Sequence, residues 1–262
     1  MYKFKIIIFP LFIAMFFACC SNEKVNLDSL IWKTGEHNGH AYVDLGLSVN
    51  WATCNIGADK PEDYGDYFAW GEIESKENFN VFSYCHYGEF ETRKKYNKIE
   101  DAGIVDDKTE LDPCDDVAAM KWGGGWRMPT LKEIEELILE TKADRHSNFR
   151  DTGITGSIML SKKNGHAIFF PAAGYKVDYL SREHQVNTKS SLKSKNSKGY
   201  YWTSTLSYDP EIPTSGSAEC FTYGYFFRNP WFIERFAGLS VRPVLDKAAT
   251  DSCRKQNKSM MR

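Results

Sequence analysis

The sequence has almost no net charge and few long runs of helix-forming residues. Its 262 residues carry a formal charge of −2, so no overall electric field draws the protein toward nucleic acid or anionic lipid. The scarcity of helix-forming runs argues against a helical bundle. The chain instead has 15% aromatic residues, and its glycines are spread along its length. This composition favours a loop-rich α+β fold around one core, and we expect no nucleic-acid partner.

The sequence also lacks the motifs of several catalytic and metal-binding sites. Gly123-Gly124-Gly125 is not followed by the Gly-Lys-Ser/Thr of a phosphate-binding loop, and no Gly-x-Ser-x-Gly nucleophile elbow occurs. The seven cysteines include no Cys-x-x-Cys pair, and His37 and His40 have no companion ligands nearby. We therefore expect no catalytic residue, no metal ion and no cofactor. We also expect mostly free, buried thiols with one disulfide at most.

A group of acidic residues has the chemistry to bind a hard cation, because carboxylate oxygens are the ligands that calcium prefers. Its members are Asp106, Asp107, Asp112, Asp115 and Asp116. Their spacing matches no EF-hand. Asp112 followed by Pro113 predicts the start of a helix, which would place Asp115 and Asp116 in its first turn, at the positive end of the helix dipole. Helix capping therefore explains two members of the group, and a calcium site is the less favoured interpretation.

The first twenty residues have the pattern of an export signal. Lys3 and Lys5 precede an apolar run over residues 6–17, which is too short to span a bilayer comfortably. The run ends in Ala18-Cys19-Cys20, which resembles the bacterial lipobox, in which a cysteine is lipidated and becomes the mature N-terminus. We predict lipidation at Cys19, with Cys20 as the alternative. An ordinary signal peptide and an uncleaved anchor are the other interpretations.

These features predict four parts of the chain. Residues 1–19 are a lipoprotein signal peptide, residues 20–38 a tether, residues 39–246 the globular domain and residues 247–262 a disordered tail. A lipid on the cysteine would hold the protein on a membrane without a spanning helix. The predicted location is the cell envelope, on the outer membrane and exposed at the cell surface.

The segment from Trp122 to Thr141 organises the predicted domain. Pro129 biases the preceding residue toward an extended conformation, and Thr130 and Glu133 have the spacing of a capping box at a helix start. Strands are predicted over residues 42–45, 48–52, 67–71, 158–160, 166–170, 200–205, 220–227 and 239–245. Residues 188–198 are predicted to be a solvated loop.

Six blocks, in this order, resemble the major paralogous domain (FISUMP) family of bacterial surface lipoproteins. They are AYVDLGLSVNWATCNIGA, PEDYGDYFAWGE, DDVAAMKWGGGWRMPTLKEIEEL, NGHAIFFPAAGY, GYYWTST and GLSVRPV. The resemblance covers roughly Gly39 to Leu245. It implies a C-type-lectin-like fold with two helices, a small twisted antiparallel sheet, long loops and neighbouring N- and C-terminal strands. It implies no activity, because one fold supports many functions.

The block from Trp126 to Thr130 also resembles a block of the formylglycine-generating enzymes, which share that fold. Their oxidase activity needs a close pair of cysteines, whereas Cys220 and Cys253 are far apart in this sequence. The Glu-Pro-Asn, Gln-Pro-Asp and Trp-Asn-Asp motifs, through which C-type lectins hold calcium, are absent as well. We therefore expect a non-enzymatic domain.

Seven residues are predicted to be structural: Trp122, Trp126, Arg127, Pro129, Thr130, Glu133 and Arg242. If both arginines are buried they need partners, for which Asp115, Asp116 or Glu133 are the candidates. An anion site built from the two arginines is the alternative.

The predicted function is a cell-envelope lipoprotein that presents a lectin-like domain and binds a glycan or protein ligand at the cell surface. Five aromatic residues are the predicted ligand contacts: Trp202, Tyr223, Tyr225, Trp231 and Phe232. Two alternatives remain open at this point. One is an envelope enzyme of unknown chemistry, for which Glu72 and Glu74 would need a cleft, and the other is a structural or adhesin subunit.

Overall fold

The computed structural model describes residues 26–87, 92–178, 189–208, 216–225 and 227–248. The predicted signal peptide, Cys19, Cys20, Cys253 and the tail beyond Ala248 lie outside these residues. The described part is an α+β fold with two α-helices, α1 (Val117–Trp122) and α2 (Leu131–Glu140). Short 3-10 helices cover Leu27–Ser29, Val81–Ser83, Glu100–Ala102 and Phe149–Asp151. No helix among the described residues has the length and apolar character needed to cross a bilayer.

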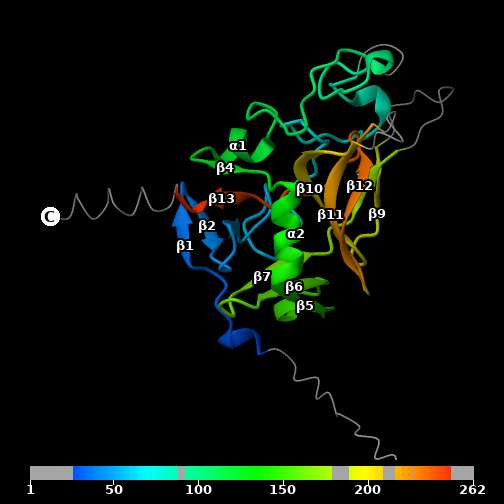
Figure 1. The fold of residues 1–262 in the computed structure, drawn as a ribbon. Coiled ribbons are helices and arrows are strands. Elements are labelled where there is room, and N and C mark those ends of the chain that lie inside the picture. The colour runs from blue at the N-terminus through cyan, green and yellow to red at the C-terminus, as the bar shows by residue number, and fades with distance from the viewer. Residues whose placement is uncertain (1–25, 88–91, 179–188, 209–215, 226, 249–262) are drawn as a thin grey trace, which may run out of the picture.

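The strands form four antiparallel sheets (Figure 1). The first has the order β1 (Gly35–His37), β2 (His40–Val43), β3 (Val49–Ala52), β13 (Val244–Asp246), β4 (Trp126–Arg127). The second contains β5 (Thr141–His146), β6 (Gly156–Ser161) and β7 (Ala167–Pro171). The third contains β10 (Gly199–Leu206), β11 (Ser217–Tyr223) and β12 (Arg228–Glu234), and β8 (Tyr175–Val177) pairs with β9 (Ser191–Lys193).

The last strand of the domain lies between two strands from much earlier in the chain. Val244 of β13 pairs with Trp51 of β3 on one side and with Arg127 of β4 on the other. Trp51, Val244 and Leu245 are fully buried. The chain therefore closes by bringing its N-terminal, central and C-terminal segments into one sheet.

Helix α2 begins as its sequence predicts. The Thr130 side chain accepts a hydrogen bond from the Glu133 amide, and the Glu133 carboxylate accepts one from the Thr130 amide, so the predicted capping box is confirmed. Ile134 and Leu137 of this helix are buried. Figure 1 shows the helix beside the sheet β10–β12, with β5–β7 at its lower end.

Helix α1 begins four residues later than predicted. Its N-cap is Asp116, whose carboxylate accepts hydrogen bonds from the amides of Ala118, Ala119 and Met128. The prediction that Asp112 caps this helix is therefore wrong. Asp116 is preferred as the N-cap because its carboxylate also accepts a hydrogen bond from the Met128 amide. No sequence pattern indicates this contact.

Three strand predictions also need correction. The segment 67–71 is buried and extended, but it forms only an isolated bridge between Phe68 and Leu239. Strands β5 and β12 were not predicted at all, because their residues are mostly polar or exposed and show no clean alternation. Residues 188–198, predicted to be a solvated loop, include strand β9.

Arg242 is fully buried and has no carboxylate partner among the described residues that contact it. Its guanidinium donates hydrogen bonds to the Asn55 side chain at 2.7 Å and to the carbonyl oxygens of Thr53 at 3.0 Å and Ala52 at 3.2 Å. It also lies 4.7 Å from the centre of the Phe170 ring. Arg242 lies in the segment before β13. It thus holds that segment against the residues that follow β3 and against β7.

Replacing Arg242 by methionine should strongly destabilise the fold. The Arg242→Met side chain fills much of the same volume, yet it removes the donors that Arg242 supplies to the oxygens of Ala52, Thr53 and Asn55. At about 1–3 kcal/mol for each unsatisfied group, partly relieved by relaxation, we expect a loss of about 3 kcal/mol in the free energy of unfolding. Urea titration followed by tryptophan fluorescence measures it.

Arg127→Met is the matched control. Arg127 pairs with Glu133 and Asp246 and its side chain is 30% exposed, so water can replace the lost contacts and we expect a loss of about 1 kcal/mol. Equal losses for the two variants would show that the buried acceptors around Arg242 do not depend on it.

Candidate functional site

A cleft of about 580 Å³ opens between the sheets β5–β7 and β10–β12. Four basic side chains line it, namely Lys142, Arg145, Lys162 and Arg228, together with the aromatic residues Tyr223, Tyr225 and Phe227. The described lining residues include no aspartate or glutamate. We call this site the basic cleft; its volume is within the range of about 300–1,000 Å³ that is typical of ligand sites.

Arg228 joins the two sheets at the basic cleft. It is the first residue of β12, and its guanidinium donates hydrogen bonds to the Thr141 hydroxyl at 2.7 Å and to the Thr141 carbonyl oxygen on β5. Partial burial lowers the pKa of Arg228, but a guanidinium stays charged at any physiological pH. Neutral acceptors therefore position this charge without cancelling it.

Arg145 is held in a similar way on the other side of the basic cleft. One of its terminal nitrogens donates a hydrogen bond to the Ser197 carbonyl oxygen at 3.2 Å, and the other donates one to the Asn196 carbonyl oxygen at 3.5 Å. Its guanidinium carbon lies 5.5 Å from the centre of the Tyr225 ring, within the range of a cation–π contact. The Tyr225 side chain is 71% exposed, so an aromatic face stands beside a fixed cation.

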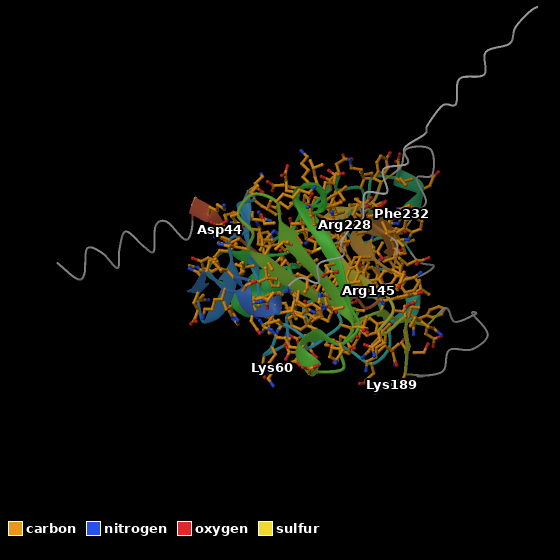
Figure 2. All side chains as sticks on the ribbon, turned by 90° about the horizontal axis from the view of Figure 1, so that it is seen from below. Asp44, Lys60, Arg145, Lys189, Arg228 and Phe232 are labelled. Carbon is orange, nitrogen blue, oxygen red and sulfur yellow. The ribbon has the colours of Figure 1, made fainter. Side chains whose placement is uncertain are left out.

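Two further cations complete the basic cleft. Lys162 donates a hydrogen bond to the Leu139 carbonyl oxygen, and Lys142 is exposed on β5. Neither forms an ion pair with a carboxylate in the part of the chain that the structure describes. Figure 2 shows Arg145 and Arg228 in the same half of the molecule as Phe232, whereas Asp44 lies toward the opposite side.

The structure divides the five predicted ligand contacts into two groups. Trp202 and Tyr223 lie in the core, where the Trp202 indole donates to the Phe68 carbonyl oxygen at 2.7 Å and the Tyr223 hydroxyl donates to the Phe170 carbonyl oxygen. Burial therefore argues against ligand contact for both side chains, although Tyr223 also forms part of the wall of the basic cleft.

The other three predicted contacts are accessible. Tyr225 lies at the basic cleft, while Trp231 and Phe232 are about half exposed on β12. The rings of Trp231 and Phe232 are parallel, with centres 5.4 Å apart. Sequence reasoning could not separate core from surface here, because aromatic residues occur in both.

The basic residues of the cleft were missed by sequence reasoning. Arg145 and Lys142 lie on β5, a strand whose polar residues give no strand pattern, and Arg228 lies some 80 residues away on β12. A weak signal exists in the sequence, since residues 142–145 and 162–163 carry four basic side chains near two predicted elements. Only the folded chain brings them to one cleft.

The residues predicted to be structural have structural contacts. The Trp126 indole donates to the His37 carbonyl oxygen at 3.1 Å, and the Pro129 carbonyl oxygen accepts from the Ser204 amide at 2.8 Å. Trp122 is half-buried and stacks on His40 with ring centres 3.7 Å apart.

Arg127 and Arg242 are both paired, but in different ways. Arg127 binds Glu133 at 2.6 Å, one of its predicted partners, whereas Arg242 binds neutral oxygens. Arg127 lies at the edge of its sheet beside Asp246, and Arg242 is enclosed. The alternative of a shared anion site is not supported, because their hydrogen bonds go to different groups.

A second cleft of about 570 Å³ lies near the first sheet and has mixed charge. Its lining includes Glu36, His40, Cys54 and Asp59. Burial raises the pKa of the Cys54 thiol and lowers the pKa of His40, so at neutral pH the thiol is protonated and the imidazole is uncharged. A thiolate is the nucleophilic form of cysteine, and the raised pKa of Cys54 disfavours it.

Two members of the acidic group, Asp112 and Asp115, form ion pairs with lysines. The Lys95 ammonium lies 2.7 Å from Asp112 and 2.5 Å from Asp115, and Lys108 lies 2.5 Å from Asp112. Asp112, Cys114 and Asp115 bring potential metal ligands within 4.8 Å of one another. Because an ammonium already bridges the two carboxylates, a cation would have to displace Lys95 to bind there.

Four cysteines are free in the described part of the chain: Cys54, Cys85, Cys114 and Cys220. Only Cys220 is buried, while Cys85 and Cys114 are exposed. The prediction of mostly buried thiols is therefore wrong for these residues.

The chemistry that the basic cleft offers is the binding of negative charge next to an aromatic surface. No pair of carboxylates that could act as acid and base occurs among its described lining residues. Comparisons with protein-family models, with curated proteins and with solved structures find no match for this chain. The function proposed below therefore rests on the geometry of the site.

The Lys95 bridge should make stability depend on pH in the acid range. Hydrogen bonds from Lys108 and Lys95 hold the pKa of Asp112 below its usual value; for Asp115, burial raises the pKa, but hydrogen bonds from Lys95 and Tyr96 lower it by more. Both carboxyl groups have a lower pKa in the folded state than in the unfolded state. They therefore stabilise the fold fully at a pH above their unfolded-state pKa of about 3.9, and this stabilisation is lost as the pH falls through their lower folded-state pKa values.

We expect Lys95→Met to be less stable than the wild type at pH 7 and to lose less stability between pH 5 and 2. Urea titrations across that pH range measure both effects, and Lys60→Met is the control, since no ion pair is recorded for that exposed side chain. If the free energy of unfolding of Lys95→Met fell between pH 5 and 2 as steeply as that of the wild type, the role given to the Lys95 bridge would be contradicted.

Proposed function

We propose that this protein is a cell-envelope lipoprotein, anchored by a lipid on Cys19 or alternatively Cys20, whose globular domain binds a glycan or protein ligand without catalysis. The proposed location is the outer membrane, with the domain exposed at the cell surface. The sequence supports the anchor through the apolar run and the Ala18-Cys19 junction. No nucleic-acid partner is proposed, since the net charge is −2.

The basic cleft is the observation that carries the binding part of this proposal. Its two arginines are held by backbone carbonyl and hydroxyl groups, and the ring of Tyr225 is exposed beside one of them. Groups fixed before the ligand arrives lose little conformational entropy on binding. A preformed cleft of cations and aromatic surface without paired carboxylates favours binding over hydrolysis.

We further propose that the domain belongs to the FISUMP-type major paralogous domain family and has its C-type-lectin-like fold. Two features support this assignment. The described residues form two α-helices, and the C-terminal strand β13 pairs with β3 from the N-terminal part. In addition, residues 53–116 between β3 and α1 contain only short 3-10 helices and isolated bridges among their described residues, as expected for long loops.

Labelling with an alkyne analogue of palmitate tests the anchor. We expect the wild type and Cys20→Ser to incorporate the label and to sediment with membranes, because the fatty acyl chain supplies the membrane affinity. Cys19→Ser should incorporate no label and should not sediment. If Cys20→Ser lost the label and Cys19→Ser kept it, Cys20 would be the lipidated residue. An unlabelled wild type would contradict the lipoprotein assignment.

A glycan array tests the binding function. We expect the purified protein to bind a subset of immobilised glycans, and Tyr225→Ala to weaken that binding roughly tenfold, which corresponds to about 1.4 kcal/mol and is near the upper end of aromatic contact energies. Affinity is then measured by titration calorimetry with the best glycan.

Ile104→Ala is the control for the array, because Ile104 is 66% exposed and does not line the basic cleft. Its binding should match that of the wild type. A wild-type protein that binds no glycan and captures no surface protein would contradict the binding function, and equal losses in both variants would place the ligand elsewhere.

A further inference from the structure

We infer that the basic cleft recognises the acid groups of a charged saccharide, with Arg145 and Arg228 contacting a carboxylate or sulfate and Tyr225 packing against a sugar ring. This inference rests on the proposed binding function and specifies its ligand class. The proposed ligand class is a saccharide that carries anionic groups, either uronate carboxylates or sulfate esters.

The first argument is the charge of the cleft relative to that of the whole molecule. The chain has a net charge of −2, yet four cations and no carboxylate occur among the described residues that line this cleft. Several lysines outside the cleft lie close to carboxylates, as Lys95 does to Asp112 and Asp115. A concentration of cations without local acids favours an anionic ligand at this one place.

The second argument is the way the two arginines are held. A guanidinium has five N–H donors in a fixed plane. Arg228 directs donors to the oxygens of Thr141, and Arg145 directs donors to the carbonyl oxygens of Ser197 and Asn196. These acceptors are neutral, so the full positive charge remains, and the remaining donors suit the paired oxygens of a carboxylate or sulfate.

The third argument separates a saccharide from other anions. Tyr225 is 71% exposed, and its ring lies 5.5 Å from the Arg145 guanidinium. A flat, amphipathic ring next to a fixed cation fits a ligand with an apolar ring face and an acid group on the same unit. A nucleic-acid backbone or a membrane surface would instead call for a charge field that extends over much of the molecule, which the net charge of −2 does not provide.

The experiment uses the full-length chain, purified from membranes in a neutral detergent. Its affinity is measured for oligogalacturonate, which carries carboxylates, for a heparin oligosaccharide, which carries sulfates, and for neutral maltoheptaose. We expect at least tenfold tighter binding of one or both anionic chains than of maltoheptaose. We also expect this affinity to fall at least tenfold between 50 and 500 mM NaCl, because salt screens exposed charges.

Variants then locate the interaction. We expect Arg145→Gln and Lys142→Gln each to weaken binding of the anionic chain by about fivefold or more. Lys142 is included because no structural contact of its side chain is recorded, so this variant should fold even if Arg145→Gln loses stability. Lys60→Gln changes the same charge outside the cleft (Figure 2) and should bind within twofold of the wild type. Thermal unfolding of every variant checks that the fold is intact.

The outcomes distinguish this inference from the function on which it rests. Equal binding of maltoheptaose and the anionic chains, or wild-type affinity in both cleft variants with intact fold, would overturn the inference while leaving glycan binding in place. Binding to no saccharide at all would contradict the glycan function as well. Equal or tighter binding to a DNA duplex or to phosphatidylglycerol vesicles would show recognition of charge alone and would also overturn the inference.

Discussion

A buried guanidinium needs hydrogen-bond acceptors, and Arg242 finds three of them in the segment around the end of β3, while one of its terminal nitrogens has no partner among the described residues. The carbonyl oxygens of Ala52 and Thr53 and the side chain of Asn55 come from the end of β3, and Phe170 of β7 covers the group. Because these acceptors lie on segments far from Arg242 in sequence, one side chain sets the relative position of β3, β7 and the chain that enters β13. The closing sheet depends on this arrangement.

Arg228 and Arg145 use the same chemistry at the surface, with a different result. Their guanidinium groups are also held by carbonyl and hydroxyl oxygens, and no carboxylate is among those partners. Arg242 is sealed by the core, so its charge can only stabilise the architecture, whereas Arg145 and Arg228 line a cleft that a ligand can enter. Exposure, and not residue type, separates the structural arginine from the ones proposed to bind.

The carboxylates of the chain are largely placed elsewhere. Asp112 and Asp115 share Lys95, and Asp116 caps α1 while it accepts a hydrogen bond from the Met128 amide. Each of these groups therefore stabilises loops around α1, and none contributes to the basic cleft. A chain with a net charge of −2 can thus have a cleft lined only by positive charges, since these carboxylates are paired elsewhere and do not neutralise the cations of the cleft.

The sequence by itself determined the local features of this protein. The capping box of Thr130 and Glu133 and the pairing of β6 with β7 follow from residues close together in the chain. For Arg127 the sequence offered three candidate partners, one of which, Glu133, is correct. Tertiary structure alone decided that Asp116 caps α1, that Trp202 and Tyr223 are buried while Tyr225 is exposed, and that Arg145 and Arg228 share one cleft. The physical reason is distance along the chain: these outcomes depend on which remote segment covers a side chain, and no local pattern contains that information.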